Sequence, residues 1–167
     1  TGGNCTVTIT GGTIGTNGRE NGMVFGSSRG DVSAPVGDVN PIDPNDYLAW
    51  VYDTHVIIGT SGSDDGPQIN GSVYGSGENG HTFNKAQVDV HSGTIGIETG
   101  EKITYKNGIE YEGPQYPYRG NVYGGGCGTD MYDSNGDKIN DKFNFLAGIV
   151  LGNTEVNIDG GHVIHNV

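Results

Sequence analysis

The sequence predicts an all-β chain whose architecture is a parallel β-helix or a related β-solenoid with inserted loops. Three observations carry this prediction: 32 glycines among 167 residues, a strand pattern that recurs along the chain, and a regular spacing between its copies. Glycine makes up about 19% of the chain, against a usual ~7%. Because glycine costs about 1 kcal/mol in a helix interior, a helical bundle is disfavoured, and the absence of a collagen period excludes a triple helix. A β-sandwich is the alternative, since it also has short strands and frequent turns.

The first recurring pattern alternates apolar and polar residues and then ends in glycine. It reads CTVTITGGTIG around Val7, AQVDVHSGTIG around Val88 and TEVNIDGGHVI around Val156, with a degenerate copy, THVIIGTSG, around Val56. In each copy the valine and the residue two positions later face the same side of a strand, as a period of two requires. We therefore expect four strands that each bury one apolar face.

The second recurring pattern is a valine followed by an aromatic residue and a glycine cluster. It reads NGMVFGSSRG around Val24, NGSVYGSGENG around Val73 and GNVYGGGCGTD around Val122. Both steps between these valines are 49 residues long, and the step from Val7 to Val56 is also 49. The equal steps indicate true repetition.

The first pattern leads to the second at a similarly regular distance. The distance is 17 residues in Val7–Val24 and Val56–Val73, and 34, or twice 17, in Val88–Val122. Short repeated strands with glycine at the corners are typical of a solenoid, in which each turn of chain buries its apolar face only against its neighbours. We expect a single β-solenoid fragment of a longer repeat protein over residues 1–167.

Three stretches fall outside the repeat, at about 31–52, 102–119 and 130–143. Loops on a rigid scaffold are favoured places for binding residues, so these insertions are the first candidates for a functional site. The second insertion is expected to form a small hairpin, because Asn107-Gly108 separates two alternating runs.

The third insertion contains the clearest candidate metal site. Its oxygen-bearing side chains alternate as D-x-N-x-D, with a further aspartate on either side, and they are Asp130, Asp133, Asn135, Asp137 and Asp141. Oxygen ligands at this spacing suit a hard cation such as Ca²⁺. The turn glycine and the final glutamate of an EF-hand loop are both missing, so a solvated acidic turn is the alternative interpretation.

Aromatic residues of the insertions are candidates for binding a glycan. They are Trp50, Tyr105, Tyr111, Tyr116 and Tyr118. Aromatic faces stack on the CH groups of sugars, and tyrosine hydroxyls form hydrogen bonds. The alternative is that these rings pack over the surface of the fold and close its sides.

Charge and motifs bound the remaining functions. The formal net charge is -12, with 20 acidic residues against 8 Lys and Arg, which argues against nucleic acid and anionic membranes as partners. The chain has no GxSxG or HExxH motif and no Cys–His arrangement that spacing supports. Cys5 and Cys127 either form a disulfide or are two separate thiols. We expect a non-enzymatic structural or adhesive module, with a carbohydrate-active enzyme, a lyase or a hydrolase, as the alternative.

The motifs VTITGGTIG, GSVYGSGENG, NVYGGGCGTD, LAGIVLGNTEVNIDGG and GHVIHNV resemble the glycine-rich repeats of very large cell-surface proteins of gut bacteria. The resemblance covers most of the chain outside the insertions and implies a secreted or surface-anchored β-solenoid, acting as an adhesin or a stalk. A glycan or a host or bacterial surface protein is the partner it implies, and it supplies no catalytic residues. The final Asn166-Val167 matches Asn121-Val122 at the start of the second pattern, so we also expect end-to-end contact with adjacent repeats or copies.

Overall fold

The protein is all-β, and its long-range strand pairing is parallel. The computed structural model describes residues 2–15, 22–30, 49–97, 102–104, 110–112, 120–128, 130–132, 138–143 and 147–167. Every regular element in these ranges is a strand, and no helix occurs in them. The all-β prediction is therefore confirmed.

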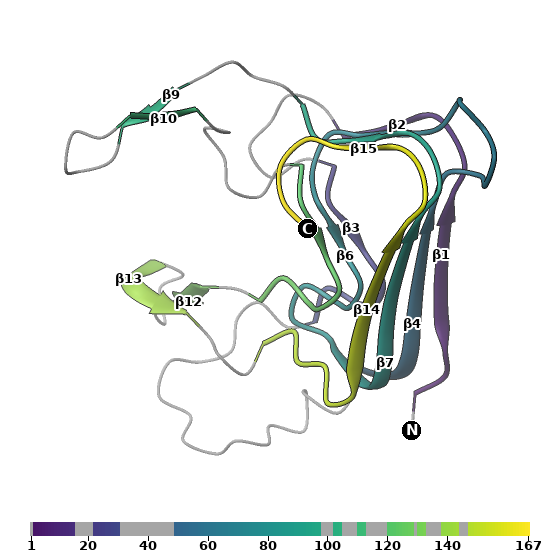
Figure 1. Ribbon diagram of the computed structural model, residues 1–167. Helices are drawn as coiled ribbons and strands as arrows, with labels where there is room; N and C mark the ends of the chain where they lie inside the picture. The colour runs from purple at the N-terminus through teal and green to yellow at the C-terminus, as the bar shows by residue number, and fades with distance from the viewer. Residues whose placement is uncertain are drawn as a thin grey trace.

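Three parallel sheets contain all the strands that carry the two repeated patterns (Figure 1). The first sheet has the order β1-β4-β7-β14, with β1 (Cys5–Ile9), β4 (Trp50–Ile58), β7 (His81–Val90) and β14 (Asn153–Ile158). The second has the order β15-β8-β5-β2, with β2 (Thr13–Ile14), β5 (Gln68–Ile69), β8 (Thr94–Ile95) and β15 (His162–Val163). The third has the order β11-β6-β3, with β3 (Val24–Phe25), β6 (Val73–Tyr74) and β11 (Val122–Tyr123). The chain thus visits the first, second and third sheet in that order, three times over, before a last visit to the first two.

The strand register aligns the repeated residues as the sequence predicts. In the first sheet Val7 pairs with Val56, Val56 with Val88, and Val88 with Val156. In the third sheet Val24 pairs with Val73, and Val73 with Val122. Each copy of a pattern therefore lies beside the equivalent residues of the next copy.

The equal 17-residue distances, in contrast, do not reflect equal connections. Three residues separate β1 from β2 and nine separate β2 from β3, whereas nine separate β4 from β5 and three separate β5 from β6. The two loops exchange their lengths, so the totals agree by coincidence. Between β7 and β11 the distance of 34 contains a three-residue connection and one of 26 residues. The interpretation of 34 as twice 17 is therefore wrong.

The insertions contain local structure of their own. Trp50 to Tyr52, which the sequence places in the first insertion, belong to β4 and the first sheet. In the second insertion β9 (Lys102–Thr104) and β10 (Glu110–Glu112) pair antiparallel on either side of 105–109, which confirms the predicted hairpin. In the third, β12 (Asp130–Tyr132) and β13 (Lys138–Phe143) also pair antiparallel. Both antiparallel pairs lie away from the three parallel sheets (Figure 1).

A narrow core of valine and isoleucine lies between the sheets. Its buried members come from all three sheets and are at most 6% exposed: Val24, Val56, Ile58, Ile69, Val73, Val88, Val90, Ile95 and Val122. The corresponding residues of the edge strands are only partly buried, among them Val7 and Val156. Beside the core, Phe25, Tyr74 and Tyr123 stack along the third sheet with ring centroids 5.2 and 5.1 Å apart. Burial therefore depends on having a neighbouring strand on both sides.

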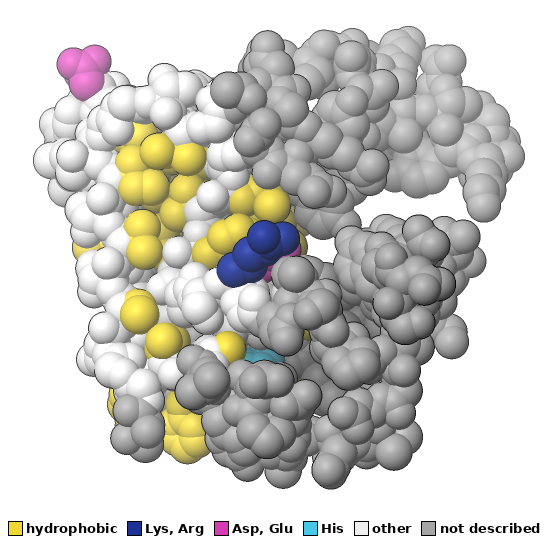
Figure 2. Space-filling model, turned by 180° about the vertical axis from the view of Figure 1, so that it is seen from behind, with side chains coloured by type: hydrophobic (Ala, Val, Ile, Leu, Met, Phe, Trp, Pro, Cys, Tyr) yellow, Lys and Arg dark blue, Asp and Glu magenta, His cyan; other side chains and the backbone are white. Residues whose placement is uncertain are grey.

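Glycine allows adjacent passes of the chain to approach closely. A Cβ added to Gly26 would overlap the carbonyl oxygen of Gly75, and one added to Gly75 would overlap that of Gly124. These three glycines follow the aromatic residues of β3, β6 and β11, so they form a column in which backbone packs on backbone. Figure 2 shows the consequence on the far face, where much of the described surface is backbone and uncharged side chains. The excess of glycine thus accounts for the thin core.

Substituting Gly75 by Ala is expected to lower the free energy of unfolding by about 1–3 kcal/mol, because the new methyl group displaces the next pass of backbone. Gly11→Ala is the matched control, since a Cβ there would meet open space, and its effect should stay within about 0.5 kcal/mol. Urea unfolding followed by tryptophan fluorescence measures both variants. Equal stabilities for the two variants would contradict the close packing of this column.

Candidate binding face

The outer face of the first sheet presents a long row of side chains to solvent. Along β7, Ala86, Val88 and Val90 are fully buried, while the intervening Gln87 and Asp89 point outward and are partly exposed. With 10 residues at about 3.3 Å each, β7 gives this face a length of roughly 30 Å. The face has three parts: aromatic rings near its start, a polar ladder in its middle and a groove at its end.

Aromatic rings gather where β4 and β7 begin. Trp50 packs on His81 with ring centroids 4.7 Å apart and meets Phe83 edge-on at 6.3 Å. Tyr52 stacks on Phe83 at 5.9 Å with an angle of 22° between the rings. Tyr52 is 43% and Phe83 56% exposed, so ring surface is open to solvent although the rings support one another.

Leu151 extends this apolar surface onto the next segment of chain. Its backbone N–H donates a hydrogen bond to the Thr82 carbonyl, and Thr82 pairs with Val150, so the register places Leu151 beside Phe83. The Leu151 side chain is 59% exposed. We call Tyr52, Phe83 and Leu151 the apolar row. Exposed apolar groups that gather on one surface are typical of binding sites.

A polar ladder centred on Asp89 crosses the middle of the face. The Asp89 carboxylate accepts hydrogen bonds from the amides of Gln87, at 2.9 Å, and Asn157, at 2.8 Å, and pairs with His55 Nε2 at 2.5 Å. Burial alone raises the pKa of the Asp89 carboxyl, but these hydrogen bonds and the charge of His55 outweigh it and hold the pKa below its usual range. One carboxylate thereby connects β4, β7 and β14.

A second pair lies two residues nearer the apolar row. The Lys85 ammonium lies 2.6 Å from the Glu155 carboxylate, and hydrogen bonds from Lys85 and Asn157 lower the pKa of Glu155. Both side chains are largely solvated, so this pair positions charge on the face and adds little stability.

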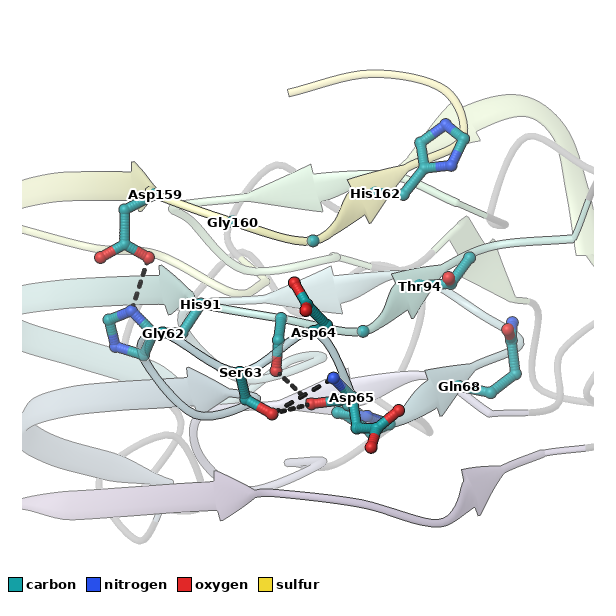
Figure 3. Close-up of a pocket in the computed structure, with 15 residues that line it drawn as sticks. Gly62, Ser63, Asp64, Asp65, Gln68, His91, Thr94, Asp159, Gly160 and His162 are labelled. Carbon is teal, nitrogen blue, oxygen red and sulfur yellow. Dashed lines mark hydrogen bonds and ion pairs between the residues drawn. The ribbon is translucent and has the colours of Figure 1, made fainter.

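A groove of about 650 Å³ ends the face (Figure 3). It lies where the chain turns from the first sheet to the second, and it is lined by the nine-residue loop 59–67 and by the three-residue corners 91–93 and 159–161. The His91 Nδ1 lies 2.7 Å from the Asp159 carboxylate on one side of the groove. Asp64 and Asp65 project from the loop, and His162 lies beyond them (Figure 3). Carboxylates, imidazoles and hydroxyls thus surround an open polar space.

Ser92 holds the loop in place over the neighbouring corner. This serine is 2% exposed, and its hydroxyl donates to the Asp65 carbonyl at 2.8 Å and accepts from the Thr60 N–H at 3.0 Å. The Ser63 hydroxyl also donates to the Asp65 carbonyl, at 2.8 Å. The loop therefore has a defined conformation without a ligand.

Sequence reasoning missed this groove and most of the apolar row. The loop carries a clear signal, GTSGSDDGP, between one strand and the next, but the equal 17-residue distances concealed it. The row needs the register of β4 against β7, because Tyr52 and Phe83 are 31 positions apart in the chain. Of its rings, only Trp50, which lies behind it, was a predicted ligand-binding residue, and Trp50 lies in a strand and is partly buried.

The other predicted site residues are not brought together by the described structure. Tyr111 lies in β10, Asp130 in β12 and Asp141 in β13, where the backbone alone is described. Tyr105, Tyr116, Tyr118, Asp133, Asn135 and Asp137 lie outside the described residues. Cys5 and Cys127 are free thiols, both partly buried. Within the described part of the chain, no group of three or more His, Cys, Asp or Glu side chains is arranged to hold a metal ion.

Comparisons with known proteins add no relative. No protein-family model, no curated protein and no solved structure matches the chain. A search of the described residues for a helix long and apolar enough to cross a bilayer finds none.

Replacing Asp89 by Asn is expected to cost about 1 kcal/mol at pH 7, because the ladder loses a charged acceptor that three side chains share. The folded-state pKa lies below the unfolded value, so the stabilisation is complete above the unfolded pKa of about 3.9 and is lost as the pH falls through the folded-state pKa. The parent protein should therefore lose stability from about pH 4 downward, and Asp89→Asn should lose less.

Melting temperatures measured between pH 7 and pH 2.5 test this. Asp64→Asn is the control, because Asp64 is an exposed carboxylate on the loop 59–67. An Asp89→Asn variant with the parent's acid sensitivity would contradict the role assigned to the ladder.

Proposed function

We propose that this chain is a non-enzymatic structural or adhesive module of a secreted or cell-surface protein, and that its parallel sheets form a β-solenoid. The solenoid is supported by the constant order in which the chain visits the three sheets and by the register of Val7, Val56, Val88 and Val156. Such a fold is extended and rigid, because each repeat packs only against its neighbours. These are the properties that a stalk or adhesive segment requires.

We propose a glycan as the ligand of the outer face. The observation that carries this proposal is the exposed stack of Tyr52 on Phe83, held from behind by Trp50. Flat apolar rings pack against the CH faces of sugars, while the amide and carboxylate groups of the ladder can bind sugar hydroxyls. A face of roughly 30 Å accommodates several sugar units of an extended chain. The net charge of -12 favours neutral or cationic glycans over anionic ones.

The groove supports the alternative, a carbohydrate-active enzyme. It places Asp64 and Asp65 of the loop and Asp159 of a different corner around one open space, with His91 paired to Asp159. Paired carboxylates are the general acid and base of glycoside hydrolysis. Binding and cleavage of a glycan are distinguished by one experiment.

The experiment incubates the protein with immobilised polysaccharides and mucins and scores both retention and soluble products. Retention without product is expected, and Tyr52→Ala combined with Phe83→Ala should weaken it by at least about tenfold, which is about 1.4 kcal/mol of binding free energy. Tyr123→Ala is the matched control, because Tyr123 is a stacked ring of the third sheet and is 37% exposed. Release of soluble sugar would replace the binding proposal by the enzyme, and undiminished retention in the double variant would exclude the apolar row.

We also propose that the third insertion binds Ca²⁺ through Asp133, Asn135 and Asp137. The D-x-N-x-D spacing supports it, although these residues lie outside the described structure. Added Ca²⁺ should raise the melting temperature and a chelator should reverse the rise, because a ligand that binds only the folded state stabilises it. The shift should disappear when Asp133 and Asp137 are both replaced by Asn. Identical melts with Ca²⁺ and with chelator would exclude the site.

A further inference from the structure

The first sheet has two edges, β1 and β14, and both are open in the described structure. β1 pairs only with β4, and β14 pairs only with β7. Half of the backbone N–H and C=O groups of each edge strand point away from its single neighbour. Among the described residues, none of these outward groups on β1 or β14 has a hydrogen-bond partner. An open edge of this kind is a template for pairing with another strand.

The side chains of the edges also leave apolar surface uncovered. Val88 and Val90 of the inner strand β7 are fully buried, but Ile158, which pairs with Val90, is 42% exposed. At the opposite edge, Val7 and Ile9 are only partly buried. Each edge therefore carries a valine and an isoleucine two positions apart that lack a neighbour on one side.

The two edges match each other in a way that the inner strands do not. The connection from β1 to β2 and the connection from β14 to β15 both have three residues, whereas that from β4 to β5 has nine. Val7 and Thr13 are six residues apart, and so are Val156 and His162. A strand register that sets Val156 against Val7 therefore also sets His162 against Thr13 and β15 against β2, so that two sheets continue together.

The charges on the edges permit this contact. In that register Glu155 lies beside Thr6, and Asn157 beside Thr8. The outward side chains of β1 are uncharged, so Glu155 meets no carboxylate. A chain of net charge -12 repels its copies in general, and this edge is a place where the repulsion is locally absent.

We propose that a second copy of this chain occupies each edge, with β14 of one copy pairing in parallel with β1 of the next and Val156 opposite Val7. The contact is head-to-tail, because it joins two different edges. A head-to-tail contact of this kind leaves a free edge at each end and so generates open oligomers rather than closed dimers. The inference deepens the proposed structural role, since it names the partner through which the module elongates.

Cysteine cross-linking tests the register directly. In a background with Cys5→Ser and Cys127→Ser, Thr8→Cys and Asn157→Cys are introduced together. Strands pair at about 4.8 Å, which is within the Cα separation that a disulfide spans. Mild oxidation at rising protein concentration should give a ladder of dimers, trimers and longer oligomers on non-reducing gels. Each single-cysteine variant should remain largely monomeric.

The matched control combines Thr8→Cys with Asn153→Cys, which moves one thiol about 13 Å along β14 and should abolish the ladder. Melting of the reduced double variants shows whether all of them fold like the parent. Dimers from the Thr8→Cys single variant would overturn the proposal in favour of a symmetric contact, as would ladders of equal strength in both registers or no oligomer from a folded double variant. Glycan retention by monomer is measured separately, so failure of assembly leaves the binding proposal standing on its own result.

Discussion

Parallel pairing in register between successive passes of the chain is the constraint on which the rest of the structure depends. It sets Val7, Val56, Val88 and Val156 side by side in one sheet. Because the alternation along each strand is the same, every pass buries its apolar face at the same place. A thin core then suffices, since each valine is covered by the equivalent residues of its two neighbours. The edge strands show the converse, as their apolar residues stay partly exposed.

The same register determines what the surface can do. Side chains at equivalent positions form columns about 4.8 Å apart across the strands. In the third sheet this spacing stacks Phe25, Tyr74 and Tyr123, and on the first it brings His55, Asp89 and Asn157 into one hydrogen-bonded ladder. Binding surfaces on such a fold are therefore made by columns and corners. The apolar row and the groove are examples of each.

Sequence patterns predicted the parts of the fold that depend on local chemistry. The period of two identified the strands of the first sheet, and Asn107-Gly108 identified the hairpin of β9 and β10. The candidate site was predicted less well. Loop lengths between strands carry little physical constraint, so the chain could exchange a three-residue and a nine-residue connection without changing the overall spacing. That exchange concealed the loop 59–67 and the groove beneath it.

By itself, the sequence determined an all-β chain with a thin core, glycine at its corners and repeated valines that align. Those properties follow from side-chain alternation and from the close backbone approach that only glycine permits, as at Gly75. The tertiary structure alone decided which distant residues meet. Tyr52 reaches Phe83, and His91 reaches Asp159, only because separate passes pair in a particular register. Such contacts depend on how many residues each loop contributes between strands, and that is settled only when the strands have paired.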